Sequence, residues 1–66
     1  MSERLWFLML NDDVVGVFDD YDIAVEETDF LKEENGENNV VLKRKFLKKL
    51  EKNSDEYDLA KEKGYI

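Results

Sequence analysis

The sequence contains no cysteine and no histidine, and these two absences remove several classes of site. Disulfide bridges need cysteine, and structural zinc sites are built mainly from cysteine and histidine. Nucleophilic and acid–base catalysis lose their commonest side chains as well, and neither the serines nor Thr28 stand beside a recognisable base motif. The acids at 19–22 do not match the spacing of an EF-hand calcium loop. We therefore expect no enzyme activity, no cofactor and no metal site.

Long apolar runs are also missing, and none approaches the ~20 residues that span a membrane. The N-terminus lacks the basic segment, apolar segment and cleavage site of a secretory signal, so we expect a cytoplasmic protein without membrane contact. The 66 residues make one domain, 1–66. A core of this size seldom contributes more than ~3–5 kcal/mol. With disulfides and zinc excluded, we expect a homodimer to supply further stability.

Positive charge is scarce in the first half of the chain and concentrated in the second. Residues 12–37 hold eleven acids and one lysine, whereas residues 43–52 hold six basic residues and one acid. The net charge of −7 disfavours direct binding to nucleic acid and favours a basic protein partner. Two arrangements remain open: the acidic and basic segments face each other, within the fold or across a dimer, or the acidic segment faces solvent.

Two apolar segments near the N-terminus predict a β-hairpin. LWFLML at 5–10 is typical of a strand buried on both faces, and VVGVF at 14–18 is typical of a second strand. Asn11-Asp12 between them predicts a tight turn. The cross-strand neighbours expected from that turn are Leu10 with Asp13, Leu8 with Val15, Trp6 with Val17, and Phe7 with Gly16.

The remaining segments predict two helices and a third strand. Asp19 is the expected N-cap of a long acidic helix within 19–37, which Asn35-Gly36 ends. Residues 39–46 predict a strand whose basic side chains are typical of a sheet edge, and 55–63 predict a short helix capped by Ser54. The fold class is therefore α+β, a ββαβα domain with a three-stranded antiparallel sheet in the order 2-1-3. The long helix covers one face of the sheet, and the last helix or a second subunit covers the other.

The predicted long helix carries carboxylates along one side. Asp22, Glu26, Asp29 and Glu33 are three or four positions apart, so they share one helix face. Tyr21, Ala24, Thr28 and Leu31 lie on the opposite side and should pack on the sheet. Like charges at this spacing repel by a few tenths of a kcal/mol per pair, and Lys32 is the only lysine in the segment. The row of acids therefore predicts a binding surface.

Two apolar residues, Ile23 and Phe30, lie beside the row of carboxylates. They are either the shoulder of a wide core face or a separate apolar spot rimmed by acids, which is the pattern of a binding surface. The candidate partner-binding residues are Asp19, Asp22, Glu26, Asp29, Glu33, Glu37, Ile23 and Phe30.

The size, the absence of Cys, His and Pro, and the order of hairpin (WFLMLNDDVVGVFDDYD), acidic helix and lysine-rich segment resemble the small early host-takeover proteins of bacteriophages. The resemblance covers the whole chain in composition and element order. Several such proteins are DNA mimics, which implies an acidic inhibitor of a basic host DNA-binding protein, such as a nucleoid-associated protein or RNA polymerase, in the host cytoplasm. The basic cluster at 43–52 limits the mimicry to one face.

Two other functions fit the same residues. A small protein-binding adaptor or inhibitor would use Ile23 and Phe30, with no DNA mimicry. An accessory domain without a fixed partner would carry its acids for solubility.

Overall fold

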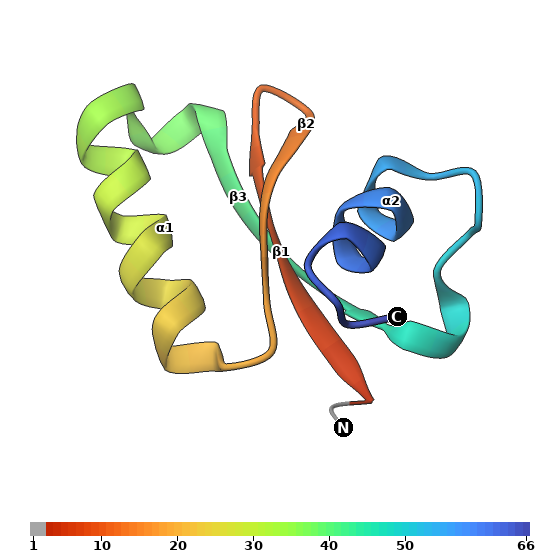
Figure 1. Ribbon diagram of the computed structural model, residues 1–66. Helices are drawn as coiled ribbons and strands as arrows, with labels where there is room; N and C mark the ends of the chain where they lie inside the picture. The colour runs from red at the N-terminus through yellow and green to blue at the C-terminus, as the bar shows by residue number, and fades with distance from the viewer. Residues whose placement is uncertain (1–2) are drawn as a thin grey trace.

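Residues 3–66 are described by a computed structural model, in which two α-helices pack on one β-sheet (Figure 1). The elements are β1 (Arg4–Leu10), β2 (Asp13–Phe18), α1 (Tyr21–Asn35), the 3-10 turn η1 (Glu37–Asn39), β3 (Val40–Phe46), the 3-10 turn η2 (Leu47–Lys49) and α2 (Asp55–Glu62). The sheet is antiparallel with the order β2-β1-β3. The predicted α+β class, element order and strand order are therefore confirmed.

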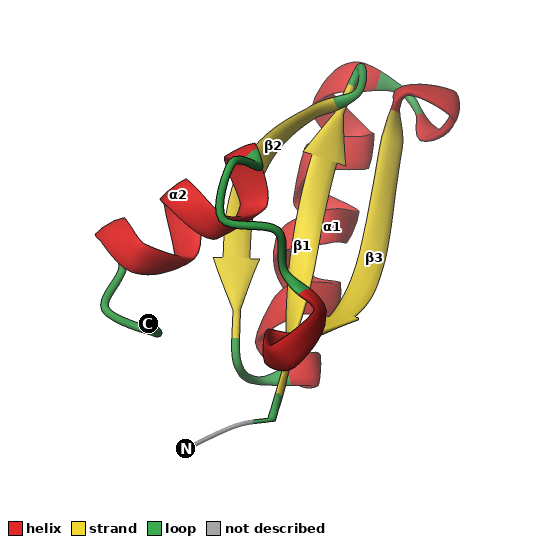
Figure 2. Cartoon of the chain, turned by 90° about the vertical axis from the view of Figure 1, so that its right-hand side faces the viewer, coloured by secondary structure: helices red, strands yellow, loops and turns green. Residues whose placement is uncertain are grey.

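One face of the sheet is covered by α2. Side chains along a strand alternate between the two faces, and Leu5 and Phe7 of β1 point to the same one. Both are fully buried, together with Val17 of β2 and Ala60 of α2. The sequence predicted that either the last helix or a second subunit would cover this face. In the structure the last helix, α2, does so, and Figure 2 shows it lying over the β2 side of the sheet.

The other face is covered by α1, which lies on the opposite side of the sheet from α2 (Figure 1). Leu8 of β1 and Val40 of β3 are buried there, and Ala24 and Thr28 are the buried residues of α1. The Thr28 hydroxyl donates a hydrogen bond of 2.6 Å to the Ala24 carbonyl, so its burial leaves no polar group unsatisfied. A strand that is apolar on both faces thus has a helix against each one.

The turn of the β1–β2 hairpin confirms the prediction from Asn11 and Asp12. Both residues have left-handed backbone angles, with φ of 50° and 71°. A two-residue hairpin turn with two positive φ values matches the twist of the strands, and Asn and Asp tolerate this conformation best after glycine. Leu10 pairs with Asp13, as expected.

Met9 with Val14 also keeps the register set by the turn, but beyond these two pairs the predicted register of the hairpin is wrong. A bulge between Leu8 and Met9 shifts the pairing, so that Leu8 lies opposite Gly16, Phe7 opposite Val17 and Trp6 opposite Phe18. The pairs expected for Leu8 with Val15, Trp6 with Val17 and Phe7 with Gly16 are not formed. A Cβ atom at Gly16 would lie 3.1 Å from the Phe18 ring, so the glycine makes room for Phe18 and not for Phe7.

The ends of α1 differ slightly from the prediction. Asp20, and not Asp19, is the N-cap, and its carboxylate accepts a 3.1 Å hydrogen bond from the Ile23 N–H. The two neighbouring aspartates are equivalent caps by residue type, so only packing on the sheet distinguishes them. Gly36 follows the helix with φ of 88°, and its N–H donates to the Lys32 carbonyl at 2.8 Å. Glu37, which the prediction placed in the helix segment, lies in η1.

The C-terminal half matches the prediction more closely. β3 begins one residue later than expected and ends at Phe46, and residues 47–49 form η2. α2 is one residue shorter than expected, and its N-cap is Ser54, whose hydroxyl accepts a hydrogen bond of 3.2 Å from the Tyr57 N–H.

Candidate protein-binding surface

The four carboxylates of the predicted row lie on the solvent side of α1. Asp22, Glu26, Asp29 and Glu33 are all exposed, because Ala24 and Thr28 turn the opposite side of the helix toward the sheet. The spacing of three or four residues therefore produces the continuous acidic face that the sequence predicts. We call these four residues the acid row.

Further acids widen the acid row. Glu27 and Glu34 are exposed on the same helix, so α1 presents six carboxylates between residues 22 and 34. At roughly 1.5 Å of rise per residue, this is one carboxylate per about 3.6 Å of helix axis. One DNA strand presents a phosphate per about 3.4 Å. The axial density of negative charge on α1 is thus close to that of a single strand of DNA.

The two candidate acids outside α1 extend the acidic surface at its ends. Asp19 is exposed in the bend before the helix, and Glu37 is exposed in η1. Glu37 joins Asp29, Lys32 and Glu33 around a hollow of about 350 Å³. Lys32 therefore places a single positive charge at the C-terminal end of the acidic surface, against three carboxylates.

Ile23 and Phe30 form an apolar spot beside the acid row. Their side chains are 51% and 58% exposed, so neither belongs to the core. Of the two arrangements left open by the sequence, the shoulder of a wide core face is therefore wrong. An apolar spot bordered by Glu27 and the acid row can be buried only by another molecule.

The basic segment at 43–52 does not neutralise the acid row. Within residues 3–66, the one ion pair closer than 4.0 Å joins Lys45 of β3 to Glu56 of α2. That pair lies on the face of the sheet opposite α1. The sequence left open whether acidic and basic segments face each other within the fold or across a dimer; within residues 3–66 of one copy they do not pair, and α1 faces solvent.

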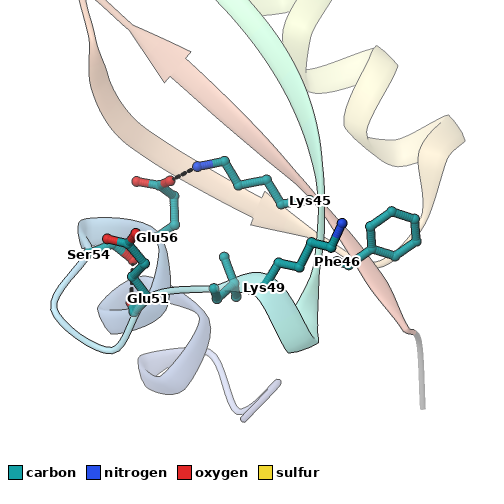
Figure 3. A pocket seen from close by; sticks show the side chains of 7 residues that line it. Lys45, Phe46, Lys49, Glu51, Ser54 and Glu56 are labelled. Carbon is teal, nitrogen blue, oxygen red and sulfur yellow. Dashed lines mark hydrogen bonds and ion pairs between the residues drawn. The ribbon is translucent and has the colours of Figure 1, made fainter.

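A second hollow, of about 390 Å³, lies between β3, η2 and the start of α2 (Figure 3). It is lined by Lys45, Phe46, Lys49, Leu50, Glu51, Ser54 and Glu56. The Phe46 ring is 43% exposed and has the Arg44 guanidinium 5.9 Å and the Lys49 ammonium 5.8 Å from its centre. The hydrogen bond from Lys45 lowers the pKa of Glu56, against the opposing effect of its burial.

Sequence reasoning did not identify this second hollow, because its residues come from two elements that the sequence does not place together. Lys45 and Glu56 are eleven positions apart, and only the course of the chain after β3 brings them into contact. The run of lysines was visible in the sequence, but not the carboxylate that pairs with one of them.

No protein-family model matches the chain, and no curated protein and no solved structure matches it. Neither described helix is long and apolar enough to cross a membrane. Residues 3–66 contain no cluster of three or more acids arranged to hold a metal ion. The surfaces described above are therefore the basis for assigning a function.

Proposed function

We propose that this protein binds a basic, DNA-binding protein in the place of DNA, through the acid row of α1, and inhibits it. We also propose that this encounter takes place in the cytoplasm, that of a bacterial host if the chain is viral. The observation that carries the proposal is the exposed, unpaired series of carboxylates along one helix.

Charge density supports this mode of binding. The six carboxylates of α1 have an average axial spacing of about 3.6 Å, close to the phosphate spacing of one DNA strand, and the four of the acid row, which share one face, average about 5.5 Å. A groove lined by lysine and arginine that fits a DNA strand therefore meets a comparable density of negative charge. In a two-fold homodimer, which we expect for a core this small, two such rows would be presented together.

Ile23 and Phe30 would add apolar contacts to the charge interactions of the acid row. Charge accelerates the encounter and selects the sign of the partner, whereas buried apolar side chains slow dissociation. Their exposure of 51% and 58% also favours a second function, that of an adaptor which binds through the apolar spot alone. The two functions differ in which residues carry the affinity.

The experiment is capture of partners from a bacterial lysate by the purified protein, with duplex DNA added as competitor. We expect the captured protein to bind DNA, to be displaced by added DNA, and to be lost as salt is raised, because salt screens the attraction between exposed charges. A captured protein with no affinity for DNA would support the adaptor and contradict mimicry.

Three variants separate the two functions by affinity for the captured protein. The acid-row variant carries Glu26→Gln, Asp29→Asn and Glu33→Gln, and mimicry predicts that it loses most of its binding. A scattered variant with the same net charge carries Glu3→Gln, Asp13→Asn and Glu51→Gln, all at exposed positions away from α1, and should bind nearly as the wild type does. The apolar variant, Ile23→Ala with Phe30→Ala, should lose most of its binding if the protein is an adaptor, and less than the acid-row variant loses if the protein is a DNA mimic.

A further inference from the structure

One side of the β3 backbone is unpaired at the edge of the sheet. In the order β2-β1-β3, β3 pairs with β1 alone. Two hydrogen bonds continue the β1–β3 register past its ends: Leu47 N–H to the Glu3 carbonyl at 2.9 Å, and Asn11 N–H to the Asn39 carbonyl at 3.0 Å. Bonded and non-bonded pairs alternate in an antiparallel ladder. The odd-numbered residues of β3 therefore bond to β1, and the even-numbered residues direct their N–H and C=O groups outward.

Leu42 and Arg44 are the central residues of this outward set. Figure 2 shows β3 at the outer edge of the sheet, with no other element of the described chain alongside it. Their backbone groups are thus available to a further strand. Binding by strand addition uses such groups for affinity and uses the neighbouring side chains for specificity.

The side chains of β3 present positive charge on both faces of the sheet. Lys43 lies on the α2 side, because it is opposite Phe7, and Arg44 lies on the α1 side, because it is opposite Trp6. Lys45 already pairs with Glu56, whereas Lys43 and Arg44 form no ion pair with any residue from 3 to 66. An added strand would place its side chains about 4.5–5.5 Å from those of β3, close to cations on either face.

The positive charges on β3 disfavour pairing of this edge with β3 of a second copy of the chain. The antiparallel register that pairs all of β3 with β3 of another copy puts Lys43 opposite Lys43, and like charges directly opposite destabilise a sheet. Lysines at a sheet edge ordinarily prevent such pairing. The same positive charges would attract an added strand whose side chains are acidic.

An apolar position adjoins the two cations. Val41 is 48% exposed, and with Met9 and Lys43 it forms the β-strand side of a hollow of about 290 Å³, whose other lining residues are polar: Asn11, Asp12, Asn38 and Asn39. A strand added beside β3 can place an apolar side chain in this hollow. Acids beside Lys43 and Arg44, followed by an apolar residue beside Val41, are therefore the pattern that the edge fits.

We propose that the β3 edge binds an extended acidic segment of a partner protein, which adds to the sheet as a fourth strand. This surface is separate from the acid row, so it gives the protein a second binding site of opposite charge. The segment pairs with the backbone of Leu42 and Arg44 and carries acids beside Lys43 and Arg44.

Hydrogen exchange measured by NMR tests the proposal residue by residue. The probe is a capped seven-residue peptide with a threonine at each end and, between them, three glutamates and then two valines. In the free protein, the amides of Lys43 and Lys45 should exchange slowly and those of Leu42 and Arg44 quickly. With the peptide at about ten times its Kd, exchange at Leu42 and Arg44 should slow by about tenfold. A failure of the peptide to bind, or binding without this protection, would overturn the proposal.

Two matched reagents separate strand pairing from attraction between charges. The same peptide N-methylated at its third and fifth residues, which lie opposite Arg44 and Leu42 in an antiparallel pairing, keeps its charge but loses the two backbone donors that face β3, and it should bind at least about tenfold more weakly. The Lys43→Glu, Arg44→Glu variant should reject the peptide and bind its lysine counterpart, with slow exchange at Phe7 confirming that it is folded. Equal affinity for the N-methylated and the unmodified peptide would contradict the proposal. So would a site that binds single-stranded DNA in place of the peptide, with the amides of Leu42 and Arg44 left unprotected from exchange.

Discussion

Lys45 and Glu56 form the contact that joins the end of β3 to the start of α2. The Glu56 side chain is 17% exposed and that of Lys45 is 41% exposed, so the pair is only partly shielded from water. The hydrogen bond from Lys45 lowers the pKa of Glu56 below its ordinary value of 4.5, although burial of the carboxyl opposes this shift. An ion pair this exposed is worth about 0.2–1 kcal/mol.

The lowered pKa gives this pair a defined dependence on pH. A carboxyl whose pKa is lower in the folded state stabilises the fold above its unfolded pKa, and this stabilisation is lost as pH falls through the folded value. Glu56→Gln should therefore reduce the free energy of unfolding by about 0.5 kcal/mol at pH 7 and by almost nothing near pH 3. Urea unfolding of both proteins between these pH values measures the difference.

Lys45→Met provides the matched background for this measurement. In that variant Glu56 has lost its main partner and keeps only its backbone hydrogen bond and the charge of Lys43, so Glu56→Gln should produce a smaller loss that grows less with pH. A loss of the same size in both backgrounds would show that Glu56 stabilises the fold through other contacts.

At the scale of elements, periodicity was sufficient to predict α1 and the side of it that packs on the sheet, although Tyr21, also predicted to pack there, is 56% exposed. Ala24 and Thr28 recur at helical spacing on one side and carboxylates on the other, and the structure buries and exposes them accordingly. The exposure of Ile23 and Phe30 did not follow from the sequence, because it depends on how far the sheet extends beneath the helix.

The hairpin shows where local patterns fail. The turn residues Asn11 and Asp12 fix the first two cross-strand pairs, but the bulge at Val15 shifts every pair after them. The bulge puts Val17 on the buried face with Phe7, whereas the ideal register would place Gly16 opposite Phe7. Burial of the larger side chain thus decides the register, and this energy depends on α2, which is distant in sequence.

Repulsion within the acid row lowers the stability of α1, whereas the proposed function needs these charges. Each pair of like charges at helical spacing costs a few tenths of a kcal/mol, and three such pairs run from Asp22 to Glu33. Glu33, in the last turn, also meets the negative end of the helix dipole. Asp22, in the first turn, is the one member of the row that the helix dipole favours.

The acid-row variant should therefore be more stable than the wild type while it binds less. Removing the three repulsive pairs should raise the free energy of unfolding by about 0.5–1.5 kcal/mol at low salt. For a domain of this size, this raises the melting temperature by about 4–8 °C per kcal/mol. Thermal unfolding followed by circular dichroism measures the change.

The scattered variant is the comparison, because it removes the same charge from positions that are not neighbours on a helix. Its melting temperature should rise less than that of the acid-row variant. A lower melting temperature for the acid-row variant would mean that these carboxylates stabilise the fold, and the argument from repulsion would be wrong.

At the scale of the whole molecule, charge is separated and not paired. Carboxylates occupy the solvent side of α1, cations occupy β3 and η2, and within the described chain a single ion pair joins a basic residue to an acidic one. With a net charge of −7, repulsion outweighs attraction across the surface.

Salt should therefore stabilise this protein. The screening length falls from about 30 Å at 0.01 M to about 3 Å at 1 M ionic strength, which removes repulsion along α1 and, to a smaller extent, the attraction between Lys45 and Glu56. We expect the melting temperature to rise by several degrees over this range of sodium chloride, since relief of about 1 kcal/mol corresponds to about 4–8 °C. The acid-row variant should respond less, because part of the repulsion is already gone. A fall in melting temperature with salt would show that attraction between the acidic and basic surfaces holds the molecule together, and an acid row engaged in this way would not be free to imitate DNA.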